Sequence, residues 1–253
     1  PIDSPLTGAD FPSEVMTYLN PTLPEIDGDL AELNNLTGLT RVKQILTDLY
    51  YRLQYDQLRQ VEDPSYHPEN PIQHMIFTGN PGTGKTTVAR LLGRMYKSLG
   101  LLRKGHCIEV SRADLVAGYV GQSALKTREV VNSALDGVLF IDEAYSLSRG
   151  AENDFGKESI DFIAQAAVDY RFRLLIIAAG YPAEMEQFLS LNPGLASRFG
   201  QPIPFLDFSL TELMHILLNL IEKNGFILPE ALNNSVAQSI RAVIRQQGAA
   251  FGN

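Results

Sequence analysis

Apolar residues follow two different periods along the chain. Between residues 29 and 60 they recur at three- and four-residue spacing, which is typical of an amphipathic helix. Further on they form short, nearly unbroken runs, which are typical of strands buried on both faces of a parallel sheet. These strand-length runs lie at 72–77, 106–110, 137–142, 173–179 and 202–205. Helical patterns separate them, at 85–99, 123–135, 156–169 and 183–191.

This alternation predicts an α/β core with a parallel five-stranded sheet. Right-handed crossover connections would place its helices on both faces. After the last run the strand pattern ends, and two helical patterns follow at 209–224 and 229–246. We therefore expect four segments: a loosely ordered extension at 1–28, rich in Pro, Asp, Ser and Thr; a helical linker segment at 29–70, interrupted at Gly38; the core at 71–206; and a helical lid subdomain at 207–253.

Composition narrows the classes of function. The formal net charge is −8 and the 21 Lys and Arg residues are scattered, which disfavours nucleic acid as a partner. The single cysteine, Cys107, lies in a strand pattern, so we expect a buried core thiol and no internal disulfide. The four histidines show no metal-ligand spacing, and we expect no metal site built by the protein alone. No apolar run approaches the roughly 20 residues of a membrane span, and the first residues lack the pattern of a signal peptide. A cytoplasmic location is expected.

The sequence GNPGTGKT at residues 79–86 follows an apolar strand and precedes a helical pattern. It matches the phosphate-loop motif G-x-x-x-x-G-K-[ST] in the context that the motif requires. Glycines allow close backbone approach to a phosphate, and the helix amino end adds positive charge. Lys85 would reach the β- and γ-phosphates, and the Thr86 hydroxyl would bind Mg²⁺. The predicted cofactors are ATP or ADP with Mg²⁺, and the predicted nucleotide-binding residues here are Gly79, Asn80, Pro81, Gly82, Thr83, Gly84, Lys85, Thr86 and Thr87.

A pair of acids, Asp142 and Glu143, ends the run GVLFID. The carboxyl ends of parallel strands are where such sheets bind ligands. Asp142 is therefore predicted to hold Mg²⁺, and Glu143 to polarise the water that attacks the γ-phosphate. The alternative is an N-cap for the next helix. Combined with the phosphate loop, the pair favours ATP hydrolysis over phosphoryl transfer to another substrate.

Longer runs of the sequence resemble the AAA+ ATPases, and among them the group that contains red-type Rubisco activase and stage V sporulation protein K. The resemblance extends from about residue 36 to the end of the chain. It rests on TGNPGTGKTTVAR (78–90), DLVAGYVGQSALKT (114–127), GVLFIDEAYSL (137–147), NDFGKESID (153–161), AAGY (178–181) and FLSLNPGLASRF (188–199).

The resemblance implies a P-loop NTPase core and a homo-oligomeric ring, usually of six subunits, with ATP at each boundary. Arg198 then matches the catalytic arginine finger, and its alternative is an ordinary surface arginine. Tyr119, Val120 and Gly121 match the pore loop that grips polypeptide, and the alternative for Tyr119 is packing on the core. Residues 149–155 lie where a second pore loop would fall. Leu39, with the flanking Leu36, matches the stretch that contacts adenine, and the alternative is plain helix packing.

Two departures from the family pattern affect these expectations. The fourth strand ends Ala178-Ala179-Gly180-Tyr181, where the family usually has a polar residue that orients water, so the identity of this sensor stays open between Tyr181 and none. The chain begins with Pro1 rather than Met and stops at Asn253, before the lid arginine that relatives carry. We therefore expect a truncated lid and a piece of a longer protein.

The favoured function is an ATP-driven remodeller that acts on a protein client through a central pore. Rubisco is one possible client, because the group includes its activase; plastid origin would place the protein in the stroma. A non-threading switch, in which ATP and assembly recruit partners, is the main alternative. Nucleic-acid handling is disfavoured by the acidic balance.

Overall fold

A computed structural model describes residues 24–68, 72–119, 121–148 and 156–247. The centre of the fold is one five-stranded sheet in the order β2-β3-β4-β1-β5, and every neighbouring pair is parallel. The predicted parallel five-stranded core is therefore confirmed. Its strands are β1 (Met75–Thr78), β2 (Cys107–Val110), β3 (Gly137–Ile141), β4 (Leu174–Gly180) and β5 (Ile203–Pro204).

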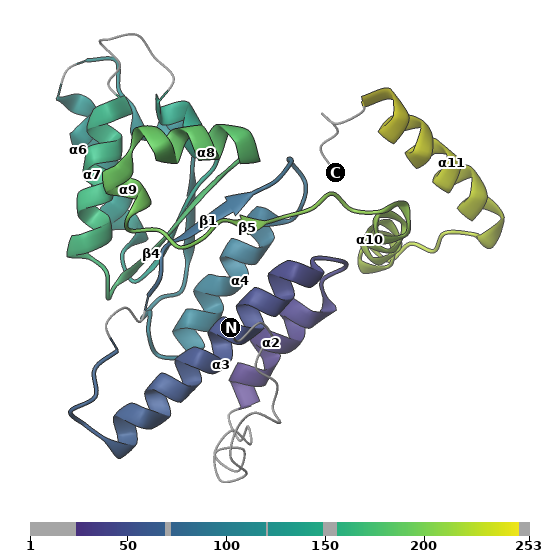
Figure 1. Cartoon of the computed structure of the whole chain (residues 1–253). Helices are drawn as coiled ribbons and strands as arrows, with labels where there is room; N and C mark the ends of the chain where they lie inside the picture. The colour runs from purple at the N-terminus through teal and green to yellow at the C-terminus, as the bar shows by residue number, and fades with distance from the viewer. Residues whose placement is uncertain (1–23, 69–71, 120, 149–155, 248–253) are drawn as a thin grey trace, which may run out of the picture.

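Helices cover both faces of this sheet (Figure 1). On one face lie α2 (Pro24–Asn35), α3 (Thr40–Glu62) and α4 (Lys85–Ser98). On the other lie α5 (Arg112–Leu115), α6 (Gln122–Ala134), the 3₁₀ helix η2 (Ala144–Ser148), α7 (Gly156–Asp169), α8 (Pro182–Leu191) and α9 (Pro193–Ala196). Parallel sheets need cover on both sides, because their strands carry apolar side chains on both faces.

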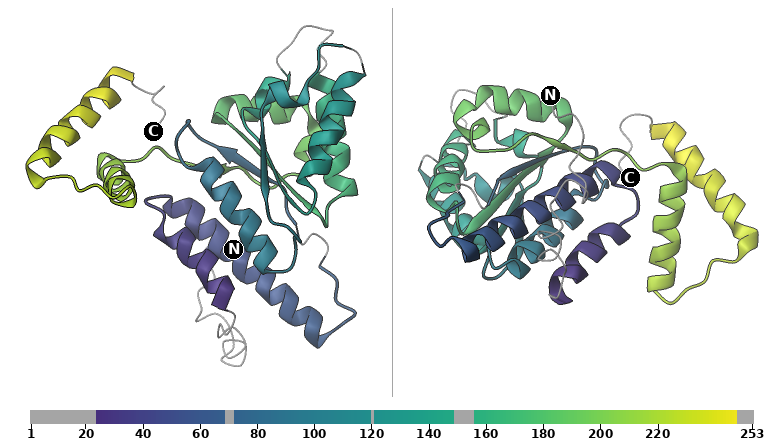
Figure 2. Two further views of the ribbon diagram at one scale, coloured as in Figure 1. Left: turned by 180° about the vertical axis from the view of Figure 1, so that it is seen from behind. Right: turned by 60° about the horizontal axis from the view of Figure 1, so that its bottom comes forward.

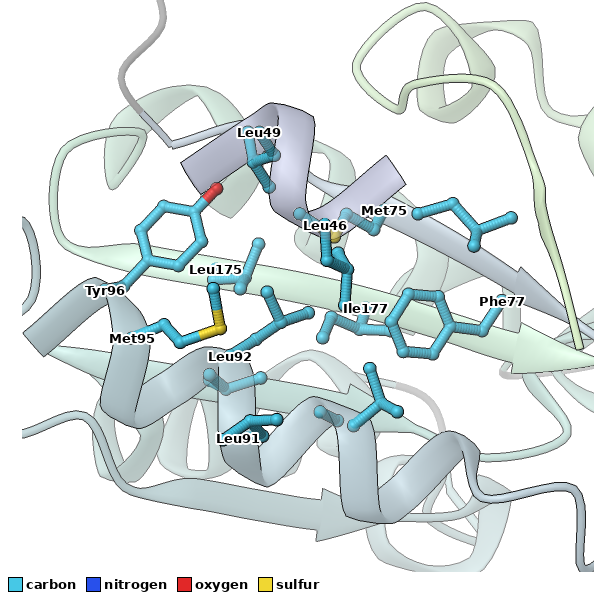
Figure 3. Close-up of a cluster of buried hydrophobic side chains, with 14 of the residues drawn as sticks. Leu46, Leu49, Met75, Phe77, Leu91, Leu92, Met95, Tyr96, Leu175 and Ile177 are labelled. Atoms are coloured by element: carbon cyan, nitrogen blue, oxygen red, sulfur yellow. The ribbon is translucent and has the colours of Figure 1, made fainter. Parts of the chain in front are cut away.

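Alternation along the strands divides the core into two layers. In β4, Leu175 and Ile177 face the layer of α3 and α4, whereas Leu174 and Ile176 face the layer of α7. Figure 3 shows the first layer, in which α3 and α4 pack against one face of the sheet. The labelled side chains of these helices and of the strands are Leu46, Leu49, Met75, Phe77, Leu91, Leu92, Met95, Tyr96, Leu175 and Ile177. These packed layers fix the ends of β1, β3 and β4 relative to each other.

Two helices stand apart from this core. Both α10 (Leu210–Lys223) and α11 (Glu230–Gln247) project beyond β5 and α4, as Figures 1 and 2 show. A capping box starts α10: the Ser209 side chain accepts from the Glu212 N–H, and the Glu212 carboxylate accepts from the Ser209 N–H at 2.7 Å. None of the residues of α10 is buried. None of the described helices is long and apolar enough to cross a membrane.

Several predicted boundaries were wrong. The helix α2 begins at Pro24, inside the segment expected to be a loosely ordered extension, because its Leu33 packs fully buried against the core. β1 begins at Met75 rather than residue 72. β5 has only two residues, as expected for an edge strand that follows Pro202 and contains Pro204, since proline cannot donate to a ladder. The short elements α5, η2 and α9 carry too little periodicity to predict, and the sequence did not indicate them.

A buried histidine replaces a ladder hydrogen bond where β1 begins. His74 Nε2 lies 2.9 Å from the Ala167 carbonyl oxygen, and the Ile176 N–H donates to His74 Nδ1 at 3.2 Å. The ring is therefore neutral, with its proton on Nε2. Burial lowers the pKa of His74 below its ordinary value, and the hydrogen bond to Ala167 opposes that shift.

This arrangement predicts a pH-dependent stability. A depressed histidine pKa means that the unfolded chain binds the proton more readily, so the contribution of His74 is complete above about pH 6.5 and declines as the pH falls below it. We expect His74→Gln to lower the free energy of unfolding at pH 8 by about 1–3 kcal/mol, through lost buried hydrogen bonds. The difference in free energy of unfolding between variant and wild type should narrow towards pH 5. Thermal unfolding from pH 5 to 8 measures it.

The exposed His67 supplies the matched control. The substitution His67→Gln should shift the melting temperature by the same small amount across this range. A His74→Gln gap that stays constant or widens on acidification would contradict the neutral, buried histidine.

Candidate functional site

The phosphate loop lies between β1 and α4, at the carboxyl edge of the sheet. Gly79 lies against Phe205, the residue directly after β5: a Cβ on Gly79 would stand 2.2 Å from the Phe205 carbonyl oxygen. Gly82 and Gly84 have φ values of 76° and 91°, which favour glycine. Gly84 is also the N-cap of α4, and it has no side chain with which to cap the helix. The first N–H groups of α4 are therefore available to an anion.

The Lys85 ammonium group is buried within this loop. Its Nζ donates to the carbonyl oxygens of Gly79 at 2.8 Å and Asn80 at 2.7 Å, and the residue is 8% exposed. Burial lowers the pKa of Lys85, while the charges of Asp142 and Asp207 oppose that shift. Phosphate oxygens would be better partners for this cation than neutral carbonyls.

Asp142 and Glu143 follow β3 directly. The Asp142 N–H donates to the Val110 carbonyl at 2.8 Å, which continues the pairing of β3 with β2. Its carboxylate Oδ1 accepts the N–H of the next residue, Glu143, at 3.0 Å, whereas an N-cap side chain accepts from the second or third residue of the helix. Glu143 has a φ of 47°, a conformation that costs about 1–3 kcal/mol in a non-glycine residue. Such strain is concentrated at functional sites.

One cavity of about 340 Å³ brings the two motifs together. It is lined by Gly79, Pro81, Gly82, Gly84, Lys85, Thr86, Thr87, Asp142, Glu143, Gly180 and Tyr181. A hydroxyl and a carboxylate, from Thr86 and Asp142, are hard oxygen donors of the kind that suit Mg²⁺. Among the described residues, no three His, Cys, Asp or Glu side chains cluster as a metal site. A Mg²⁺ ion here would therefore complete its coordination with phosphate oxygens and water.

The end of β4 contributes Gly180 and Tyr181 to the cavity. Ala178 and Ala179 are buried within the sheet. Tyr181 is the polar side chain at this strand end that faces the cavity, and its ring lies 6.1 Å from that of Tyr145. Tyr181 therefore lines the cavity, and its role as the residue that orients water stays a prediction.

Leu39 lies against the phosphate loop. Its Cδ1 would be 3.6 Å from a Cβ on Gly84, and its own φ is 56° at the start of α3. The residue is not among those that line the cavity, so a contact between Leu39 and adenine stays a prediction.

Arg198 lies at the opposite edge of the sheet. The neighbouring Phe199 pairs with His74 before β1 begins, and the Gly200 N–H donates to the His74 carbonyl at 3.1 Å. His74 precedes Gly79 by five residues, which is about 16 Å of extended chain. The Arg198 side chain instead donates to the Gly194 carbonyl and lines a second cavity, with Arg52 and Arg171. The structure does not bring Arg198 to the phosphate loop of its own chain.

Tyr119 lies between α5 and α6 and is 72% exposed, so it does not pack on the core. Two residues on, the Gly121 N–H donates to the Glu158 carboxylate at 3.1 Å, which anchors the loop to α7. Val120 and the second pore-loop segment 149–155 lie outside the described residues.

Comparison with known proteins agrees with this geometry. Residues 75–205, from β1 to Phe205, match the model of the ATPase family associated with various cellular activities. The chain belongs to the AAA ATPase family. The relatives are those of the predicted group, which confirms that resemblance.

Stage V sporulation protein K of Bacillus subtilis is 45% identical over 79% of this chain, which covers 61% of that protein. The chloroplastic ribulose bisphosphate carboxylase/oxygenase activase of Cyanidioschyzon merolae is 42% identical over 85% of the chain, which covers 71% of it. This AAA chain thus spans about 61% and 71% of the length of these two relatives. The AAA domain of FIGL-1, solved in complex with ADP, matches with a TM-score of 0.54 and 21% identity, over 81% of this chain and 65% of that one. This likeness supports the fold.

The contact between Gly79 and Phe205 predicts the effect of adding one methyl group. Gly79→Ala would force the loop away from Phe205, so we expect more than about tenfold weaker ATP binding and a loss of a few kcal/mol of stability. Gly118→Ala is the matched control, because nothing lies within 4 Å of a Cβ there. Calorimetric titration with ATP and thermal unfolding measure both effects. Equal behaviour of the two variants would contradict the described loop.

Proposed function

We propose that this AAA chain hydrolyses ATP in a Mg²⁺-dependent reaction. The cavity that joins Lys85 to Asp142 and Glu143 carries this proposal. The loop backbone and Lys85 would bind the phosphates, and Thr86 and Asp142 would hold the metal. Mg²⁺, when bound, neutralises charge on the β- and γ-phosphates.

Glu143 is the proposed base. Glu143 is exposed and lines the cavity, so its carboxylate is available to orient a water and accept its proton. Glu143 has a left-handed backbone conformation directly after Asp142. In this proposal the Asp142 carboxylate binds the metal and the Glu143 carboxylate binds the water. Lys85 stabilises negative charge as the γ-phosphate is transferred.

Arg198 supports an assembly of several subunits, and the family pattern makes this a ring of six. The residue lies at the edge of the sheet opposite its own phosphate loop, so it can act only on a nucleotide held by another copy. A guanidinium group there would stabilise charge on the transferring phosphoryl group. ATP would then lie at each subunit boundary.

The mechanical function proposed is remodelling of a protein client through the central pore. The exposed Tyr119 supports it, because an aromatic side chain on an anchored loop gives sequence-tolerant contact with polypeptide. Rubisco is one candidate client, since a relative is a Rubisco activase. We place the reaction in the cytoplasm, or in the stroma for a plastid protein.

Two variants separate binding from hydrolysis. Lys85→Ala should lose ATP affinity by more than about a hundredfold, because it removes the cation within the loop. Glu143→Gln keeps the shape of the side chain without the base, so it should bind ATP within about threefold of wild type and hydrolyse it at least about a hundredfold more slowly. Titration calorimetry and phosphate release measure the two properties.

A conservative control is Glu186→Gln, which changes an exposed acid of α8. It should leave both properties unchanged. Hydrolysis at the wild-type rate by Glu143→Gln would refute the assignment of the base, and tight ATP binding by Lys85→Ala would refute the site.

A further inference from the structure

A hydrogen-bonded pair connects the phosphate loop to the entry of the lid. The Asn80 side-chain amide lies 2.9 Å from each carboxylate oxygen of Asp207. The two residues are 127 positions apart in sequence. Asp207 belongs to the short connection between β5 and α10, so the pair spans the boundary between the core and the helices that stand apart from it.

The backbone of the same asparagine supports the catalytic lysine. Its carbonyl oxygen accepts from Lys85 Nζ at 2.7 Å and from Thr83 Oγ1 at 2.8 Å. One residue therefore has its carbonyl bonded within the phosphate loop and its side chain bonded to the lid connection. A displacement of this peptide would alter both sets of contacts.

The lid connection has few other contacts with the core. β5 pairs with β1 over two residues, and the Phe205 N–H then donates to the Thr78 carbonyl at 2.7 Å. Leu206 is exposed, and α10 has no buried residue. Further contacts lie at Gly38, where a Cβ would meet the Glu212 carboxylate at 2.5 Å and the Phe208 ring at 3.1 Å. Glu212 also interacts electrostatically with Lys43 of α3. The Asn80–Asp207 pair joins the phosphate loop to this connection through a charge-assisted hydrogen bond, which helps to place the lid.

Phosphate binding would change the hydrogen bonds that the Asn80 carbonyl accepts. The Lys85 ammonium now bonds to neutral carbonyls, and anionic phosphate oxygens would compete for it. The Asn80 carbonyl would then lose one of its two donors, while its side chain stays bonded to Asp207. This couples occupation of the loop to the position of residues 205–210.

We propose that Asp207 is a positioning residue for nucleotide binding, which acts through the Asn80 side chain to join the phosphate loop to the lid. The inference rests on the proposed nucleotide site. Asp207 itself need not touch the nucleotide; it sets the position of the loop that does.

Exchange of the two side chains tests this. Asn80→Asp places two carboxylates face to face, whereas Asn80→Asp combined with Asp207→Asn restores an amide–carboxylate pair with the same net charge. On a Glu143→Gln background, which retains ATP, we expect Asn80→Asp to weaken ATP affinity about tenfold and the double exchange to recover it to within about threefold of wild type. Hydrogen exchange should show ATP-dependent protection of residues 206–214 in the parent and the double variant, and not in Asn80→Asp or Asp207→Asn alone.

A matched control is Glu222→Gln, which removes an exposed acid from the last turn of α10, about 18 Å from the first residue of that helix. It should change neither the ATP affinity nor the protection of residues 206–214. The proposal would be overturned if the effects of the two single exchanges on ATP affinity were additive. It would also be overturned if Asp207→Asn kept the ATP-dependent protection of residues 206–214. A parent that binds no ATP at all would instead refute the nucleotide site. Circular dichroism verifies folding, which exposed positions such as Asp207 should not disturb.

Discussion

A buried ammonium group has to be solvated by the protein or by a ligand, and the arrangement of this site follows from that requirement. Water reaches Lys85 poorly, so its charge is met by the carbonyls of Gly79 and Asn80 and, at longer range, by Asp142 and Asp207. Neutral carbonyls are weaker partners than phosphate oxygens, and the loop is therefore already shaped for an anion before one binds. The parallel sheet makes this possible, because packing on both faces fixes the strand ends that carry these groups.

The same sheet places two groups of candidate site residues at opposite edges. Its carboxyl edge bears the phosphate loop, Asp142 and Glu143, whereas Arg198 lies near the opposite edge, where β1 begins. Side chains cannot cover that distance within one chain. If Arg198 serves as the proposed finger, a subunit of this AAA protein would hold both halves of a hydrolytic site at positions that only an assembly could bring together. This separation would make ATP turnover depend on neighbours, which is the property that a ring motor needs.

Much of the fold and the nucleotide cavity could be predicted from the sequence, since both depend on local patterns. Buried strands read as apolar runs, and the phosphate loop is a contiguous motif whose glycines are required by its backbone. Contacts made by residues far apart in sequence could not be predicted. Asp207 has no local signature, and its partner Asn80 is 127 positions away. The start of α2 at Pro24 and the two-residue β5 were likewise decided by packing and edge geometry rather than by periodicity.

The most direct test of the central claim is the ATPase rate of a mixture of two inactive chains. Lys85→Ala keeps its arginine and lacks a working phosphate loop, and Arg198→Ala has the reverse defect. If Arg198 acts across a subunit boundary, each variant alone should be inactive, and an equal mixture should recover about a quarter of the wild-type rate, the share of boundaries that combine an intact loop with an intact arginine. A mixture as inactive as its components, or full activity of Arg198→Ala alone, would contradict the account.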